Sequence, residues 1–179
     1  EQAIRAAANP DKAKTLSGFF KTGKGEYGEQ DIFIGIPVPV TRNIVKQYLD
    51  TPLDQLEILL HNPVHELRMA ALLCMVEQFK KADANRREAI YHTYLSNTAY
   101  INNWDLVDLS APGIVGEYLK DKSRDDLYRL ADGALLWEQR IAVVSTYTLI
   151  KNGDFTDILA LSERLLHHPH DLMRKAVGW

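Results

Sequence analysis

Short segments in which apolar residues recur at helical spacing alternate with short polar turns along the whole chain. Three Xaa-Pro pairs, Asn9-Pro10, Thr51-Pro52 and Asn62-Pro63, are typical helix starts, with a capping side chain before a proline of fixed φ. A further helix is expected from Pro39 to about Asp50. Alternation of the strand type is nearly absent, so the pattern predicts an all-α chain.

A polar, glycine-rich stretch, residues 21–30, interrupts this helical pattern. It follows a helix that is expected to run from Pro10 to Phe20, and its composition predicts a loop. Residues 18–25 approach the spacing of a phosphate-binding P-loop. However, Gly25 occupies the position where a serine or threonine must bind magnesium, and no strand precedes it. Nucleotide hydrolysis is therefore not expected.

The chain contains an internal repeat. Arg68, Trp104 and Arg140 are each 36 residues apart, and a further step of 34 reaches Arg174. Two and three positions after each of these lies a pair of small or branched apolar residues: Ala70-Ala71, Leu106-Val107, Ala142-Val143 and Ala176-Val177. Helix pairs with this period predict an α-solenoid of HEAT-like repeats, and a generic helical bundle is the alternative.

Stacking of such repeats would align the four large residues along one concave surface. Three guanidinium groups and an indole in a row suit a phosphate backbone, because the arginine fork matches phosphate oxygens. The alternative is that the arginines pair with nearby carboxylates such as Glu66 and Glu138.

One position departs from the repeat. Asp108 lies four residues after Trp104, on the same helix face, and the matching positions in the neighbouring repeats are Leu72 and Val144. An ionised carboxylate at an apolar position costs several kcal/mol unless it is paired. This departure indicates a functional residue. The structural alternative is that Asp108 caps a neighbouring helix or pairs with Arg140.

The last segment carries a second tryptophan at an equivalent edge. Trp179 is expected within a helix, and the adjacent Gly178 would allow another group to approach closely. Trp104, Trp179 and Asp108 are therefore predicted to converge on one cleft. The alternative is that both indoles belong to the core.

Composition limits the possible compartment and binding partners of the protein. The 179 residues are 46% hydrophobic and 25% charged, and a single cysteine predicts a reducing, cytoplasmic compartment. No apolar run approaches the roughly 20 residues that span a bilayer. The net charge of −3 disfavours nucleic-acid binding unless basic residues cluster locally. The chain begins without Met and ends at Trp179, so we expect a single domain, residues 1–179, truncated at its C-terminal end.

Two other groups of reactive side chains are assigned to structure rather than chemistry. The histidines near 61–65 and 167–170 lie in predicted helix-start loops without a cysteine pair, so no metal site is expected. Cys74 lies on an apolar helix face and is expected in the core.

Several pieces spread along the chain together resemble one family, the HEAT-like bacterial DNA alkylation repair glycosylases (the AlkD-like family). The pieces occur in the family's order: Phe20-Lys21 with the following glycine-rich loop, Phe33-Ile34-Gly35-Ile36 with Pro39 and Arg42, Trp104-Asp105-Leu106-Val107-Asp108, Trp137-Glu138-Gln139-Arg140, and Arg174-Lys175-Ala176-Val177-Gly178-Trp179.

The resemblance implies hydrolysis of the N-glycosidic bond of N3- and N7-alkylated purines in duplex DNA, without metal or cofactor. It implies that Asp108 is the catalytic aspartate, that Trp104 and Trp179 contact the lesion nucleotide, and that Arg140 lies in the cleft. Phe19 and Val38 occupy positions where the family has a tyrosine and a threonine. The expected DNA-binding residues are Arg140, Arg42, Lys21, Lys24, Phe19, Arg174 and Lys175; for the two loop lysines, a solvated loop is the alternative.

The residue types agree with this chemistry. A purine alkylated at N3 or N7 is cationic and leaves readily, so one carboxylate that stabilises the oxocarbenium ion and positions water is sufficient. We expect a monomer that acts on double-stranded DNA. The alternative function is a non-catalytic module that binds DNA structures or a protein partner.

Overall fold

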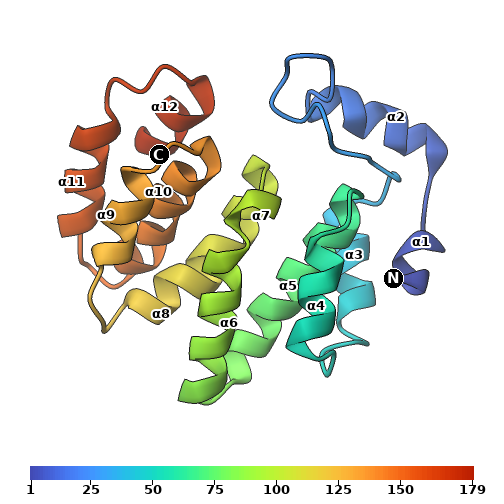
Figure 1. The fold of residues 1–179 in the computed structure, drawn as a ribbon, viewed down its shortest axis with the longest axis horizontal. Helices are drawn as coiled ribbons and strands as arrows, with labels where there is room; N and C mark the ends of the chain where they lie inside the picture. Colours follow the sequence, from blue (N-terminus) through green and yellow to red (C-terminus); the bar gives the residue numbers. More distant parts are fainter.

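The computed structural model describes residues 1–179 as helices joined by turns and loops (Figure 1). The α-helices are α1 (Gln2–Arg5), α2 (Pro10–Phe19), α3 (Val38–Val45), α4 (Leu53–Leu60), α5 (His65–Lys81), α6 (Ala84–Ser96), α7 (Trp104–Ala111), α8 (Glu117–Leu119), α9 (Asp125–Ala131), α10 (Leu136–Lys151), α11 (Thr156–Leu165) and α12 (Asp171–Val177). A 3₁₀ helix, η1 (Thr98–Tyr100), precedes α7, and a π-helical turn, η2 (Pro112–Gly116), follows it.

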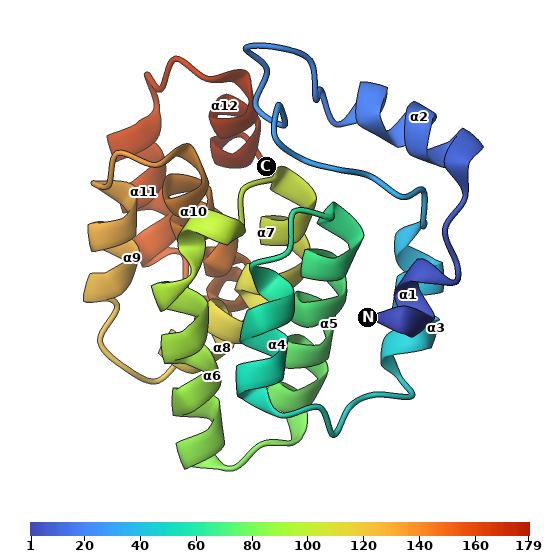
Figure 2. The same ribbon diagram turned by 45° about the vertical axis from the view of Figure 1, so that its right-hand side comes forward.

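Successive helices pack side by side in a curved row. Helix α4 lies against α5, α7 lies between α5 and α10, and α10 also packs against α9, α11 and α12. Figure 2 shows the same order from a second direction. The only β contact is an isolated bridge between Ile32 and Val64. The predicted all-α solenoid is confirmed. None of its helices combines the length and apolar character that crossing a bilayer requires.

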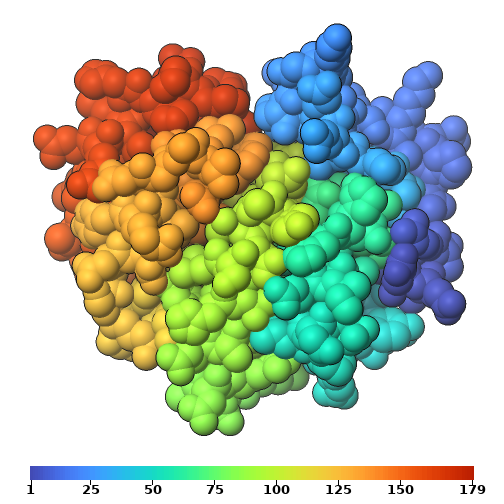
Figure 3. Space-filling view, in the orientation of Figure 1, coloured from blue at the N-terminus to red at the C-terminus, as the bar shows by residue number.

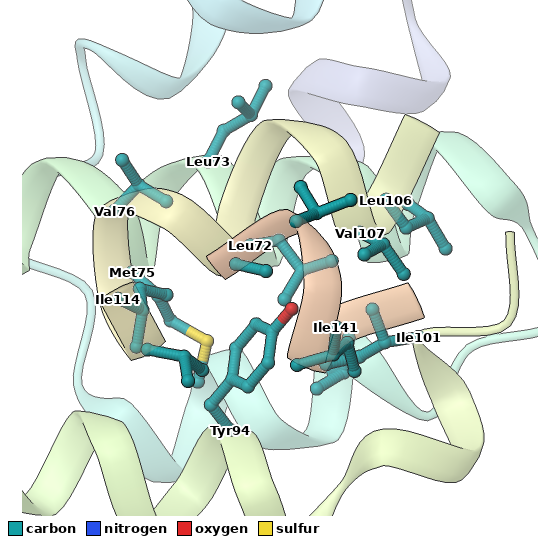
Figure 4. Packing of buried hydrophobic residues seen from close by; sticks show 14 of the residues in the cluster. Leu72, Leu73, Met75, Val76, Tyr94, Ile101, Leu106, Val107, Ile114 and Ile141 are labelled. Atoms are coloured by element: carbon teal, nitrogen blue, oxygen red, sulfur yellow. The ribbon is translucent and has the colours of Figure 1, made fainter. Parts of the chain in front are cut away.

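The apolar pairs of the sequence repeat form part of the core. Ala71, Leu106, Val107 and Ala142 have no exposed surface, and the first members of the outer pairs, Ala70 and Ala176, are also buried. Around them pack the side chains that Figure 4 labels: Leu72, Leu73, Met75, Val76, Tyr94, Ile101, Ile114 and Ile141. The sequence repeat therefore indicates which faces of the helices pack against one another.

Several helix ends differ from the predicted ones. Asn9 caps α2 as expected, accepting a hydrogen bond of 3.0 Å from the backbone N–H of Lys12. Helix α3 ends at Val45, earlier than predicted. Trp179 is not within a helix, because α12 ends at Val177 and Gly178 is its C-cap.

The turn after α7 brings this helix close to α10. Pro112 has no N–H with which to continue the α-helical hydrogen bonds, and the chain widens there into the π-helical turn. A Cβ atom on Gly116 would lie 2.4 Å from the backbone oxygen of Ser145, so only glycine allows this approach to α10. The close packing places Asp108, on α7, opposite Arg140, on α10.

Candidate active site

A cleft opens between α7, α10 and the C-terminal helix α12. Its volume is about 490 Å³, and its lining residues are Trp104, Asp108, Arg140, Leu172, Lys175, Gly178 and Trp179. Figure 2 shows α7, α12 and the C-terminal end of the chain next to one another. The cleft therefore contains the three residues that were expected to converge, Trp104, Asp108 and Trp179.

Asp108 is held at the cleft wall by Arg140. The Nε and Nη2 atoms of Arg140 each donate a hydrogen bond of 2.8 Å, one to each carboxylate oxygen of Asp108. Its Nη1 donates to the backbone oxygen of Leu172 at 2.6 Å, which fixes the guanidinium against α12. The Asp108 side chain keeps 15% of its surface exposed, against 7% for Arg140. The acid is thus paired, as the structural alternative expected, and still reaches the cleft.

Aromatic packing fixes the orientation of Trp104. The ring of Phe20 stacks on the indole with centroids 5.2 Å apart and an interplanar angle of 20°. Phe19 meets the indole edge-on at 6.0 Å and is itself 63% exposed. Phe33 stacks on the other side of Phe20 at 4.9 Å. Trp104 therefore lies at the end of an aromatic stack whose other rings, Phe20 and Phe33, stand on either side of the N-terminal loop (residues 21–30) in the sequence.

Trp179 reaches the cleft from the other side. It is 89% exposed, so the alternative that both indoles belong to the core is wrong for this residue. Trp104 is partly buried, and both indoles line the same cleft as Asp108. An acid and two indole faces in one open cleft can contact a cationic or electron-poor ligand.

The predicted DNA-binding residues lie at different distances from this cleft. Lys175 lines it and pairs with Asp171 at 3.2 Å. Arg174, on the same helix, is exposed, as are Lys21 and Lys24 in the N-terminal loop. The charge of Lys21 contributes, after burial, to the lowered pKa of His170, so this lysine lies near the C-terminal helices. Arg42 is on α3 and does not line the cleft.

The expectation that Arg68 shares a concave surface with Arg140 and Arg174 is wrong. Arg68 is only 4% exposed and donates a 2.6 Å hydrogen bond to Asp31. Its other contacts are with the backbone oxygens of Asn62 and Pro63. Arg68 and Arg140 do pair with carboxylates, as the alternative expected, but their partners are Asp31 and Asp108 and not Glu66 and Glu138. Arg174 has no carboxylate partner.

Glu66 and Glu138 accept hydrogen bonds from backbone N–H groups and from a hydroxyl group instead. Glu66 accepts hydrogen bonds from three consecutive N–H groups, of Ile34, Gly35 and Ile36, at 2.8–3.2 Å. Glu138 accepts one of 2.7 Å from the Thr98 hydroxyl. The Glu66 contacts anchor the segment after the N-terminal loop to the start of α5.

A buried polar network lies beneath Trp104, and the sequence analysis did not identify it. The two ring nitrogens of His65 face Asp31 at 3.2 Å and Asp105 at 2.9 Å. Burial opposes a charged His65, but hydrogen bonds to Asp105 and Asp31 raise the pKa of the ring. Burial alone would raise the pKa of Asp31, yet His65 and Arg68 outweigh it and lower this pKa to about 2. The network ties the first turn of α7 to α5.

The remaining reactive side chains do not form a further site. No three side chains among the histidines, cysteine, aspartates and glutamates are placed to hold a metal ion. Cys74 is buried, as predicted, and burial raises the pKa of its thiol to about 11. A thiol of this kind is protonated at neutral pH and unsuited to nucleophilic attack.

Comparisons with known proteins identify the fold and the family of the chain. No curated protein matches the sequence. Among solved structures, a predicted DNA alkylation repair enzyme from Enterococcus faecalis shares the fold, with a TM-score of 0.70 and 18% identity over 96% of this chain and 80% of that chain. A family model described as DNA alkylation repair enzyme matches residues 1–179. The chain therefore belongs to the DNA alkylation repair enzyme family.

Proposed function

We propose that this protein is a DNA glycosylase that hydrolyses the N-glycosidic bond of N3- and N7-alkylated purines in duplex DNA. One observation carries the proposal: the Asp108 carboxylate and the indoles of Trp104 and Trp179 line one cleft. The protein acts as a single domain and as a monomer, without a metal or cofactor.

The proposed reaction begins with a base that is already cationic. The bond between C1′ and the purine nitrogen breaks, the electron pair goes to the purine, and the base leaves neutral. The sugar is left as an oxocarbenium ion, which the negative charge of Asp108 stabilises. Water then adds to C1′, and Asp108 orients this water and receives its proton.

Arg140 supports this role without contacting the substrate. A guanidinium that binds both carboxylate oxygens fixes the plane of the carboxylate. The exposed part of Asp108 remains free to face the sugar. We therefore revise the expected role of Arg140 from phosphate binding to positioning of the catalytic acid.

The two indoles supply recognition of charge. A cation over an indole face gains about 0.5–2 kcal/mol, and both the alkylated purine and the oxocarbenium ion are cationic. Because an uncharged purine gains much less, Trp104 and Trp179 favour the damaged nucleotide over normal ones. The exposed faces of the cleft suit contact with the nucleotide from its sugar–phosphate side.

Exposed basic residues near the cleft are proposed to bind the duplex. Lys175 lines the cleft, Arg174 lies beside it on α12, and Lys21 and Lys24 project from the N-terminal loop. In this proposal these four cationic side chains contact phosphates of the duplex, although the net charge of the chain is −3. Phe19, exposed beside Trp104, adds an apolar contact.

The test compares release of 7-methylguanine from methylated duplex DNA by the wild-type protein and by Asp108→Asn. We expect wild-type release, and a loss of between roughly a hundredfold and a thousandfold in the variant with unchanged duplex affinity. The matched control is Asp132→Asn, because Asp132 pairs with Arg164 on the surface, away from the cleft. Release by Asp108→Asn at the wild-type rate would show that the assigned role is wrong.

A second function, a non-catalytic module that binds DNA structures, is favoured by one observation: both oxygens of Asp108 already accept hydrogen bonds from Arg140. This alternative predicts that the wild-type protein binds duplex DNA and releases no base. The same assay therefore separates the two functions.

A further inference from the structure

Asp31 is a buried acid that gathers hydrogen-bond donors from two parts of the fold. Only 7% of the residue is exposed. Its Oδ1 accepts hydrogen bonds from Arg68 at 2.6 Å and from the amide of Asn102 at 3.2 Å. Its Oδ2 accepts one from the amide of Asn103 at 3.3 Å and faces Nδ1 of His65 at 3.2 Å. Arg68 and His65 belong to α5 and the two asparagines directly precede α7, so one carboxylate links these elements.

The segment that carries Asp31 is itself held at the start of α5. The backbone N–H of Asp31 donates to the oxygen of Gly28 at 2.9 Å. The N–H of Ile32 donates to the oxygen of Pro63 at 3.2 Å, and the oxygen of Ile32 accepts from the N–H of His65 at 2.8 Å. In the space-filling view, the blue N-terminal segment lies against the green and yellow-green middle of the chain (Figure 3). Asp31 is therefore presented to α7 from a fixed backbone.

A first path from Asp31 to α7 runs through Asn103, the N-cap of this helix. The side chain of Asn103 is held at both ends. Its Oδ1 accepts a hydrogen bond of 2.9 Å from the backbone N–H of Trp104, while its Nδ2 donates to Asp31. Asn103 has no exposed surface, so no water competes for these bonds. The backbone of Trp104 is thus joined to Asp31 through a single side chain.

A second path runs through His65 to the first turn of α7. Nε2 of His65 faces one carboxylate oxygen of Asp105 at 2.9 Å, and the other oxygen of Asp105 accepts from the N–H of Leu106 at 2.8 Å. Because a carboxylate only accepts hydrogen bonds, His65 donates to Asp31 and Asp105 from its two ring nitrogens. Asp108 follows one residue after the first turn of α7. The second path therefore restrains the helix that carries Asp108.

The polar character of this network suits the fixing of a geometry. Buried charges lose solvation energy that pairing at best offsets, so apolar side chains would join the two helices equally well. Hydrogen bonds, in contrast to apolar contacts, depend on angle as well as on distance. The ring of Phe20 also packs against both the His65 ring and the Trp104 indole, with centroids 5.2 Å apart in each case. The network thus bears on the backbone and on the indole of Trp104.

From these contacts we propose that Asp31 is a positioning residue, which fixes the first turn of α7 and with it the places of Trp104 and Asp108 in the cleft. The inference rests on the proposed function for its effect on catalysis. Asp31 does not line the cleft and acts through Asn103 and His65. Loss of these links lets the start of α7 move, so that the indole and the acid no longer face the same nucleotide.

Three variants separate this role from helix capping. Asn103→Asp keeps the size of the side chain and the capping oxygen, since aspartate and asparagine cap helices about equally well. It also replaces the donor that faces Asp31 by a carboxylate oxygen, so two buried acids repel each other. Asn103→Ser keeps a capping oxygen, removes the donor and adds no charge, and it replaces Asn103→Asp if that variant does not fold. The double variant Asp31→Asn/Asn103→Asp exchanges donor and acceptor and restores the link.

The first test reads the start of α7 without requiring any activity. The indole and backbone N–H signals of Trp104 are recorded by NMR on ¹⁵N-labelled protein. Asn103→Asp is expected to shift both signals and to speed exchange of the backbone N–H more than that of amides in α11, whereas a global loss of stability would speed both alike. The double variant should return the signals toward their wild-type positions. Trp104 signals that stay in place in Asn103→Asp, or in Asn103→Ser where it is used instead, overturn the positioning role.

The second test measures base release at saturating protein, at a temperature where circular dichroism shows every variant folded. Asn103→Asp is expected to slow single-turnover release of 7-methylguanine by roughly tenfold to a hundredfold, with a much smaller change in duplex affinity. Asn103→Ser should show a smaller loss, and the double variant should recover most of the wild-type rate. A role in stability alone would leave the rate constant at saturation unchanged, and that result would overturn the inference.

The matched control is Asp83→Asn, which exchanges the same two residue types at another helix N-cap. Asp83 caps α6 by accepting a hydrogen bond of 2.8 Å from the N–H of Arg86, and it lies outside the cleft. Its replacement should change neither the Trp104 signals nor the release rate. A loss of rate in Asp83→Asn as large as that in Asn103→Asp would show that the link to Asp31 is not the cause.

The two tests separate this inference from the proposed function. If the wild-type protein releases no base, but Asn103→Asp moves the Trp104 signals and the double variant restores them, the glycosylase proposal fails and the positioning of α7 by Asp31 is supported. If the wild-type protein releases base while both Asn103 variants match it in rate and spectrum, the glycosylase proposal stands and the inference about Asp31 fails.

Discussion

Arg140 binds both carboxylate oxygens of Asp108 at 2.8 Å, although the two residues are 32 positions apart and lie on different helices. The pair is mostly buried, with 7% and 15% of the side-chain surfaces exposed. Such a pair has two consequences. It makes each partner costly to remove alone, and it holds the acid in one orientation in the cleft.

Removal of Arg140 should destabilise the protein because it leaves the Asp108 carboxylate without its partner. We expect Arg140→Gln to lower the free energy of unfolding by about 3 kcal/mol. The double variant Arg140→Gln/Asp108→Asn leaves no unpaired charge. Its loss in the free energy of unfolding should therefore be about 1–2 kcal/mol smaller than the sum of the losses in the two single variants. Urea denaturation of the four proteins measures this. The control is Arg164→Gln, whose exposed pair with Asp132 should contribute at most about 1 kcal/mol. Strict additivity of the two changes would contradict a coupled pair.

Replacement of Trp179 should change the rate of base release and not the stability of the protein. Because this side chain is 89% exposed, Trp179→Ala should leave the melting temperature unchanged. Loss of one cation–π contact of about 0.5–2 kcal/mol predicts a decrease in the release rate of cationic bases by roughly twofold to thirtyfold. The comparison variant is Leu159→Ala on α11, which removes a side chain that is 68% exposed and lies outside the cleft. An equal effect of both variants would argue against a role for the indole.

The position of Asp108 could be predicted from the sequence because it breaks a repeat. Leu72 and Val144, the equivalent residues, are 1% and 5% exposed, so the rule that Asp108 breaks is a real property of the fold. The 36-residue period likewise predicted the burial of the apolar pairs, apart from Val177, which is only partly buried. The period of a repeat shows which residues lie on the buried face of a helix. An acidic residue at one of these positions can therefore be recognised from the sequence.

The same reasoning could not predict the fate of Arg68. Its partner, Asp31, lies 37 positions earlier in a segment without periodicity, and its burial depends on the path of that segment over α5. The contacts of Tyr27 with Trp137 and His170 likewise depend on the path of a segment without periodicity. Loops are placed by tertiary contacts such as those of Glu66 with the backbone of 34–36, which leave no repeating pattern in the sequence.

The buried network around His65 predicts how stability depends on pH. The pKa of Asp31 is lowered from 3.8 to about 2, so its contribution is present above pH 3.8 and is lost as the pH falls toward 2. The pKa of His65 is raised from 6.5, so its contribution is present below pH 6.5 and is lost as the pH rises through the folded-state value. The network should therefore stabilise the protein most between about pH 4 and pH 6.5.

Denaturation of the wild type and of Asp31→Asn across this range tests the prediction. The shift in the Asp31 pKa corresponds to about 2 kcal/mol, which the variant should lack above pH 4. The difference between the two proteins should shrink as the pH falls toward 2, because Asp31 becomes neutral in the wild type as well. A difference that stays constant between pH 2 and pH 6 would show that Asp31 acts through packing and not through its charge.

The salt dependence of DNA binding distinguishes basic residues that contact phosphates from those that hold the protein together. Lys175 and Arg174 are exposed on α12, whereas Arg140 is committed to Asp108 and Leu172. Each phosphate contact adds about 0.9 to the slope of log affinity against log salt concentration. Lys175→Ala and Arg174→Ala should each reduce this slope by about that amount, and Arg140→Lys should leave it unchanged. The slope is obtained by titrating a labelled duplex at several salt concentrations. A reduced slope in Arg140→Lys, with unchanged slopes in the two α12 variants, would reverse these roles and assign phosphate binding to the residue that contacts Asp108.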